Sequence, residues 1–160
     1  MNKVLGSIPT WIWSGMIAVI AFAAGFVTNY YISYRSNYLS ALNANYEQFD
    51  TSAAEVRQSL KTFADIANGQ KKKTEQDAAE IQMRLLTAVT KAEDLSRRIN
   101  TDTSFIRSYE TAAVNLKAAT ATVSGPIDGK GLVLAVNDYL VAEKGVRDAV
   151  LKEYNAFIWR

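Results

Sequence analysis

The sequence predicts an all-α protein, with an N-terminal transmembrane helix followed by an antiparallel four-helix-bundle-like domain of coiled-coil character. Residues 4–34 carry no charged side chain and are largely apolar, and the chain has only two prolines, Pro9 and Pro126. Beyond residue 35, apolar residues recur at alternating spacings of three and four. This spacing follows one face of a helix and does not fit the alternation of a strand.

The uncharged stretch is long enough to span a bilayer. A spanning helix needs roughly 20 mostly apolar residues, and Pro9 suits the first turn of a helix because its missing N–H would have no partner there. We expect a short tail at residues 1–8, the transmembrane helix at 9–34 and the helical domain at 35–160. A cleavable signal peptide is the alternative, since Ala21-Phe-Ala23 resembles a cleavage site. The apolar run continues to Val27, which favours an uncleaved anchor.

Two groups of residues in this region are candidate membrane contacts. Aromatic rings at the ends of an apolar segment match the two bilayer interfaces. The C-terminal Trp159 fits the same role if the last helix returns to the membrane; the alternative is that Phe157 and Trp159 complete the core of the bundle. The expected interface residues are Trp11, Trp13, Tyr30, Tyr31, Tyr34 and Trp159. Small residues four apart allow two helices to approach closely in lipid. The expected helix-association residues are Ser14, Ala18, Ala21 and Gly25.

The orientation follows from few charges. The α-amine and Lys3 precede the anchor, whereas Arg35 alone follows it closely. The positive-inside rule then favours a cytoplasmic N-terminus and an extracytoplasmic domain, in the inner or plasma membrane. Apart from Lys3 and Arg35, the chain has 16 basic and 16 acidic residues, and this balance argues against a nucleic-acid partner.

The domain is expected to hold four helices, at about 35–68, 72–99, 102–123 and 132–158. Gly69 is a natural stop for the first, which continues the register of the anchor, and the loop around Pro126 separates the last two. Each helix has one apolar stripe, so an up-down-up-down bundle buries all four economically. A parallel homo-oligomeric coiled coil is the alternative. The expected inner positions are Leu39, Leu42, Tyr46, Phe49, Ala53, Val56, Leu60, Phe63, Ala67, Ala78, Ile81, Leu85, Ala88, Ala92, Leu95, Ile99, Phe105, Tyr109, Ala112, Leu116, Ala119, Val123, Val136, Tyr139 or Leu140, Val146, Val150 and Phe157.

The sequence contains little that could carry catalysis. It has no histidine and no cysteine, the residue types of the commonest general base, of thiol nucleophiles and of structural zinc sites. We therefore predict no enzyme activity, no catalytic residue, no cofactor and no metal. Glu143 falls near the inner stripe of the last expected helix and is the acid that we single out, although a structural role is the more common one at such a position. Lys71-Lys-Lys73 is expected to be a solvated turn, with a lipid or protein contact as the alternative.

The predicted function is a single-pass, membrane-anchored scaffold or accessory protein that acts through protein–protein contacts. Its expected partners are the lipid bilayer and other subunits of a membrane complex, or further copies of itself. One alternative is an extracytoplasmic sensor-like bundle that binds a small solute, with Tyr109, Tyr139 and Arg107 as lining residues. Another is a phage-type lysis or membrane-perturbing protein, which shares the plan of an anchor and an outer helical segment.

Overall fold

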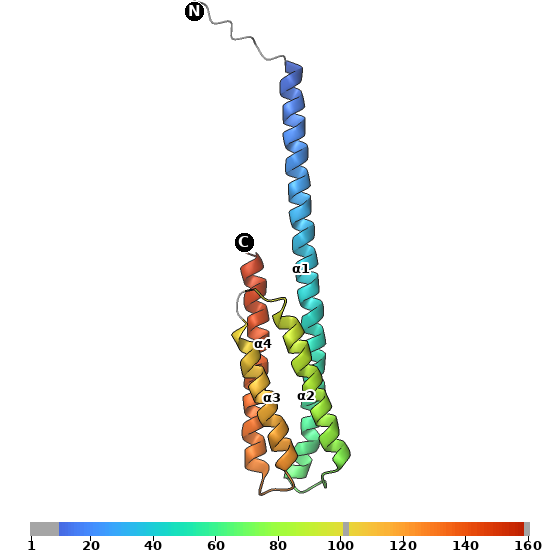
Figure 1. The fold of residues 1–160 in the computed structure, drawn as a ribbon, viewed down its shortest axis with the longest axis vertical. Coiled ribbons are helices and arrows are strands. Elements are labelled where there is room, and N and C mark those ends of the chain that lie inside the picture. Colours follow the sequence, from blue (N-terminus) through green and yellow to red (C-terminus); the bar gives the residue numbers. More distant parts are fainter. Residues whose placement is uncertain (1–9, 101–102, 159–160) are drawn as a thin grey trace, which may run out of the picture. The chain divides into compact units, whose positions relative to one another are not determined.

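The structure is a computed structural model that describes residues 10–100 and 103–158. This part of the chain forms four α-helices and no strand, which confirms the predicted all-α class (Figure 1). The helices are α1 at Thr10–Ala67, α2 at Glu75–Ser96, α3 at Ser104–Thr122 and α4 at Gly129–Ile158.

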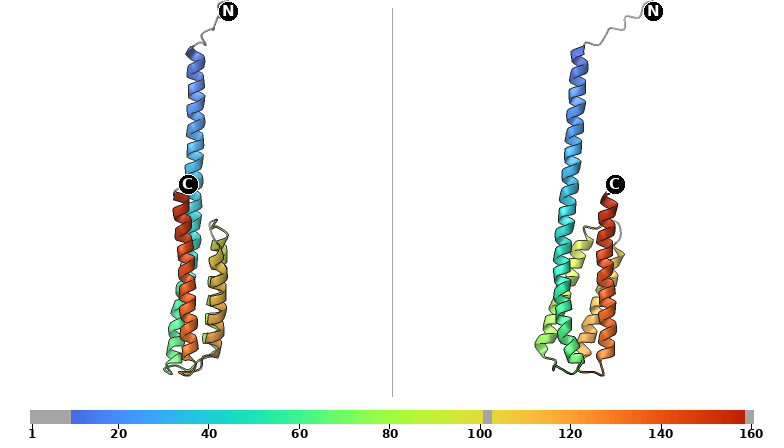
Figure 2. Two further views of the ribbon diagram at one scale, coloured as in Figure 1. Left: turned by 90° about the vertical axis from the view of Figure 1, so that its left-hand side faces the viewer. Right: turned by 180° about the vertical axis from the view of Figure 1, so that it is seen from behind.

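The chain divides after Ser40 into two compact units. The N-terminal unit is the part before Ala41, and the helical unit is the part from Ala41 onward. Helix α1 contributes its first 31 residues to the N-terminal unit and its remainder to the helical unit. In the helical unit, that remainder, α2, α3 and α4 lie side by side in a bundle-like arrangement (Figures 1 and 2).

A backbone motif ends α1 where the sequence predicts a stop. Gly69 has a φ of +72°, in the left-handed region that glycine enters without steric cost. Its N–H donates to the carbonyl of Ile66 at 3.0 Å, and the N–H of Gln70 donates to that of Asp65 at 2.8 Å. These two bonds satisfy carbonyls that the helix end would otherwise leave without a partner. The prediction that Gly69 stops this helix is confirmed.

Helix α2 begins later than residue 72 because Thr74 caps it. The Thr74 hydroxyl accepts from the Asp77 N–H at 3.1 Å, and the Asp77 carboxylate accepts from the Thr74 N–H at 2.9 Å, which together form a capping box. Lys71 donates to the same carboxylate at 2.7 Å. The hydrogen bond from Lys71, supported by those from Thr74, lowers the pKa of Asp77 to about 2. The Asp77 carboxylate of this capping box therefore stays charged at neutral and mildly acidic pH.

Helix α4 begins at Gly129, earlier than the expected position near residue 132. The Asp128 carboxylate accepts hydrogen bonds from the N–H and the hydroxyl of Ser124, at 3.2 and 2.8 Å. These bonds close the loop around Pro126 into a tight turn, so the chain is ready to start a helix directly after it. The turn residues between Ser124 and Gly131 predict a longer loop, but the last three residues of that stretch belong to α4.

The core of the helical unit consists mainly of the predicted inner stripes. On α4 the structure decides between two neighbours, because Tyr139 is fully buried whereas Leu140 is 42% exposed. Of the other predicted positions, Leu39, Tyr46, Ala67, Ala78, Ala119, Val136 and Phe157 are half-buried. The buried ones are Leu42, Phe49, Ala53, Val56, Leu60, Phe63, Ile81, Leu85, Ala88, Ala92, Leu95, Ile99, Phe105, Tyr109, Ala112, Leu116, Val123, Val146 and Val150.

Hydrogen bonds from basic side chains also link the elements of the helical unit. Arg84 of α2 donates to the backbone carbonyl of Glu55 of α1 at 2.8 Å. Lys73, just before α2, donates to the carbonyl of Thr120 at the end of α3 at 2.7 Å. A lysine is favourable there because the last carbonyls of a helix have no partner within it and carry partial negative charge.

Candidate functional site

The apolar segment at the start of α1 is the first candidate site. Measured by length and composition, α1 is the one helix of the described residues that could cross a membrane, and its most apolar stretch has a mean hydropathy of 1.6 with none of it buried. Large apolar side chains point outward along it, including Val19 at 69% and Phe22 at 77% exposure. A signal sequence near the N-terminus has the same properties.

The predicted membrane contacts lie on this segment as far as the structure describes them. Tyr30, Tyr31 and Tyr34 are 68%, 47% and 56% exposed. Ala18, Ala21 and Gly25 are exposed as well, and a Cβ added at Gly25 would meet nothing within 4 Å. The side chains of Trp11, Trp13 and Ser14 lie outside the described residues, although their backbone belongs to α1. Trp159 also lies outside the described residues.

A cluster of four charged side chains joins α1 to α4. Glu143 is the centre of this cluster, and its Oε1 atom accepts from Arg57 of α1 and, at 2.7 Å, from Arg147. Arg147 also donates to Asp50 of α1 at 2.8 Å. The Glu143 side chain is only 5% exposed, whereas Arg57 and Arg147 are 33% and 41% exposed. Two positive and two negative charges balance within the cluster.

The cluster is suited to fixing the register of α1 against α4. A carboxylate this deeply buried is stable only when it is paired, and sliding one helix along the other would separate Glu143 from Arg57. The Oε2 atom of Glu143 and the Nε atom of Arg147 are buried and form no hydrogen bond, so the cluster leaves two polar atoms unsatisfied. Sequence reasoning singled out Glu143 but not its two arginines.

Two tyrosine hydroxyls meet inside the same core. The hydroxyls of Tyr109 and Tyr139 lie 2.6 Å apart, within hydrogen-bonding distance, and both side chains are fully buried. Phe49 packs edge-on against Tyr109, with ring centroids 5.4 Å apart. Burial raises the pKa of both tyrosines far above their usual value, so both hydroxyls stay protonated. Sequence reasoning placed these tyrosines on inner faces but did not predict that their hydroxyls pair.

We expect the tyrosine pair to behave as one energetic unit. Tyr109→Phe or Tyr139→Phe alone should destabilise the helical unit by about 1–2 kcal/mol, because each leaves a buried hydroxyl without its partner. The double substitution should cost much less than the sum of the two singles. Chemical denaturation of the four proteins in a double-mutant cycle measures this coupling. Strictly additive costs would contradict the pairing.

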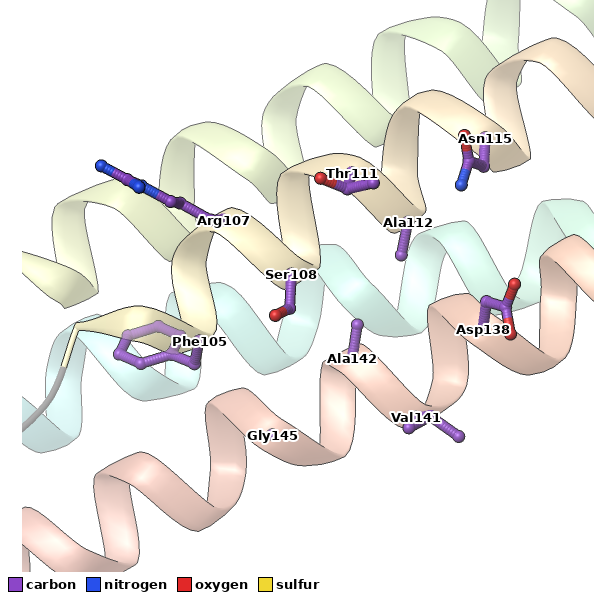
Figure 3. A pocket seen from close by; sticks show the side chains of 10 residues that line it. All are labelled: Phe105, Arg107, Ser108, Thr111, Ala112, Asn115, Asp138, Val141, Ala142 and Gly145. Carbon is purple, nitrogen blue, oxygen red and sulfur yellow. The ribbon is translucent and has the colours of Figure 1, made fainter.

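A groove between α3 and α4 is a further candidate site (Figure 3). It has a volume of about 610 Å³ and is open to solvent. In Figure 3, Ser108, Ala112 and Ala142 lie between the two helices, and Arg107 points away from α4. The polar lining residues are Arg107, Ser108, Thr111, Asn115 and Asp138. Of the three residues expected to line a solute site, only Arg107 lies here, because Tyr109 and Tyr139 are buried against each other.

Within the described residues, the acidic side chains do not assemble into a metal site. Across residues 10–100 and 103–158, no three acidic, histidine or cysteine side chains come together in a way that could hold a metal ion.

At the Lys71–Lys73 turn, Lys71 pairs with Asp77, and Lys73 donates a hydrogen bond to the end of α3. Two of the three lysines therefore form contacts within the helical unit.

Comparison of the chain with known protein families, with curated proteins and with solved structures finds no match.

Proposed function

We propose that this chain is a single-pass membrane protein, anchored by the apolar part of α1, whose helical unit is an antiparallel four-helix bundle acting through protein–protein contacts. In this proposal it is a scaffold or accessory subunit of a membrane complex and has no enzymatic activity. The anchor begins in the cytoplasm, and the bundle lies on the other side of the membrane.

The observation that carries the proposal is that the described part of the apolar segment is exposed along its whole length. None of its most apolar stretch is buried by other parts of the chain. Removing apolar surface from water contributes about 25 cal/mol per Å², so side chains such as Val19 and Phe22 favour a surrounding that is itself apolar. A bilayer supplies it along the whole segment, and the exposed tyrosines at its end suit the interface.

The helical unit supports a role in protein contact. Its conspicuous polar features are ion pairs and hydrogen bonds that hold its own helices in register, and the chain contains neither histidine nor cysteine. Solute binding in the groove between α3 and α4 is a second candidate function, favoured by the polar residues along that groove. We rank it below the scaffold role because the two tyrosines expected to bind the solute are occupied with each other.

Membrane fractionation tests the anchor. We expect the full chain to stay in the membrane after alkaline carbonate washing, and the double variant Ile20→Arg/Ala24→Arg to be released, because an arginine at the centre of a span costs about 2.5–3.5 kcal/mol. The matched control is Leu134→Arg/Val141→Arg, which puts the same two charges at exposed positions of α4. This control should remain in the membrane.

A topology measurement accompanies the fractionation. A C-terminal reporter that is active only outside the cytoplasm should give signal, and one active only inside should not. Release of the intact wild-type chain by carbonate would refute the anchor. A shortened chain beginning shortly after Ala23 would show instead that the segment is a cleaved signal peptide. A signal from the inside reporter would reverse the proposed orientation.

A further inference from the structure

Helices α2 and α3 leave a row of apolar side chains uncovered along the groove between them. Met83 and Leu86 of α2 are each 67% exposed, and Val114 of α3 is 64% exposed. The groove has a volume of about 460 Å³, and Leu85 and Ala113 also line it. Side chains of this size leave apolar surface in contact with water, and contiguous apolar patches on soluble surfaces commonly mark interaction sites.

Two opposite charges flank the apolar row on α3. Glu110 and Lys117 line the same groove and stand on either side of Val114. They are seven residues apart, which places them on one face but separates their backbones by about 10 Å along the helix axis. Within the described residues, none of the ion pairs formed involves either of them. The groove therefore carries an acid at one end and a base at the other, and both are available to a partner.

We propose that this groove binds a second copy of the chain. The two copies are related by a two-fold axis that lies in the interface between them, perpendicular to α3 and level with Val114. Such an axis reverses the direction of the second helix, so Glu110 of each copy lies opposite Lys117 of the other. The interface then contains two identical ion pairs around a shared apolar centre. Apolar burial supplies most of the affinity, and the charges select the register.

A parallel pairing uses the charges less well. A two-fold axis along the helices would place α3 of one copy on α2 of the other. The α2 residues that line the groove, namely Gln82, Met83, Leu85, Leu86 and Val89, are all uncharged. Glu110 and Lys117 would then face no opposite charge, while losing part of their hydration. The charge pattern therefore favours the antiparallel pair.

The pairing deepens the proposed scaffold function, on which its membrane consequence rests. In an antiparallel pair, the two Ala41 ends, where the chain enters the helical unit, lie at opposite ends of the interface. This arrangement allows copies anchored in two apposed bilayers to meet and hold those bilayers together. Full-length protein in lipid vesicles should cluster those vesicles.

A charge-exchange experiment tests the pair in the full chain in detergent micelles, with protein mass measured by sedimentation. We expect the wild type to dimerise, and Glu110→Lys or Lys117→Glu alone to weaken the dimer at least about tenfold, because each turns both ion pairs into repulsions. Glu110→Lys/Lys117→Glu should restore the dimer. An equimolar mixture of the two single variants should form heterodimers. Lys61→Glu, an exposed reversal on α1, is the matched control and should leave the dimer unchanged.

The outcomes separate this inference from the proposed anchor. A wild type that is monomeric at all concentrations, a dimer that ignores both single reversals, or a double variant that stays monomeric would overturn the pairing. A monomeric chain that resists carbonate extraction would leave the anchor intact and refute the pairing. A chain that dimerises but is released by carbonate would retain the pairing and refute the anchor.

Discussion

Leu85→Asp is expected to unfold the helical unit. Leu85 is 3% exposed on the inner face of α2, so the substitution removes a packed leucine and places a carboxylate where it has no partner. Loss of a buried leucine side chain costs about 2–5 kcal/mol, and an unpaired buried charge adds to that cost. The total is comparable to the whole stability of a small domain, about 5–15 kcal/mol. Thermal melting followed by circular dichroism should show loss of the cooperative transition.

The neighbouring residue supplies the control. Leu86 belongs to the same helix but is 67% exposed, so Leu86→Asp places its charge in water. Substitutions at such positions usually change stability by no more than about 0.5 kcal/mol. Measured at high dilution, where copies of the chain are unpaired, this variant should melt like the wild type. Equal melting of the Leu85 variant would show that the inner stripe of α2 is assigned incorrectly.

Glu143→Ala is expected to destabilise the helical unit by about 2 kcal/mol. Removing one partner of a fully buried ion pair costs about 3–5 kcal/mol. The cost is smaller here because Arg57 and Arg147 are 33% and 41% exposed and can turn toward water. Asp50 also keeps Arg147 partly paired, at 2.8 Å. Denaturant titration gives the change as a shift of the midpoint at constant slope.

Asp148→Ala is the control for Glu143→Ala, because Asp148 is an exposed acid on the same helix. It should change the free energy of unfolding by less than about 0.5 kcal/mol. If the two variants were equally stable, the ion cluster would not hold α1 against α4. A large cost at Glu143 together with a low cost at Asp148 would assign the effect to the cluster and not to the loss of a negative charge.

The turn between α1 and α2 shows which structural features local sequence patterns can predict and which they cannot. The stop at Gly69 was predictable because a positive φ strongly favours glycine and the apolar register ends just before it. The start of α2 was missed by three residues, although Thr74 and Asp77 have the spacing of a capping box. An aspartate in place of the usual glutamate weakened that signal. The role of Lys73 at the end of α3 had no local signal, because its partner Thr120 is distant in the chain.

The sequence alone was sufficient to predict four helices, most of their inner stripes and the apolar segment, because these depend on spacings of three and four and on local composition. It did not give the starts of α2 and α4. The tertiary structure decided that Tyr139 and not Leu140 is buried, that Tyr139 meets Tyr109, and that Glu143 pairs with Arg57. Each of these outcomes depends on how far one packed helix is rotated and shifted along another. That relation is set by side chains far apart in the chain, so the periodicity of a single helix cannot specify it.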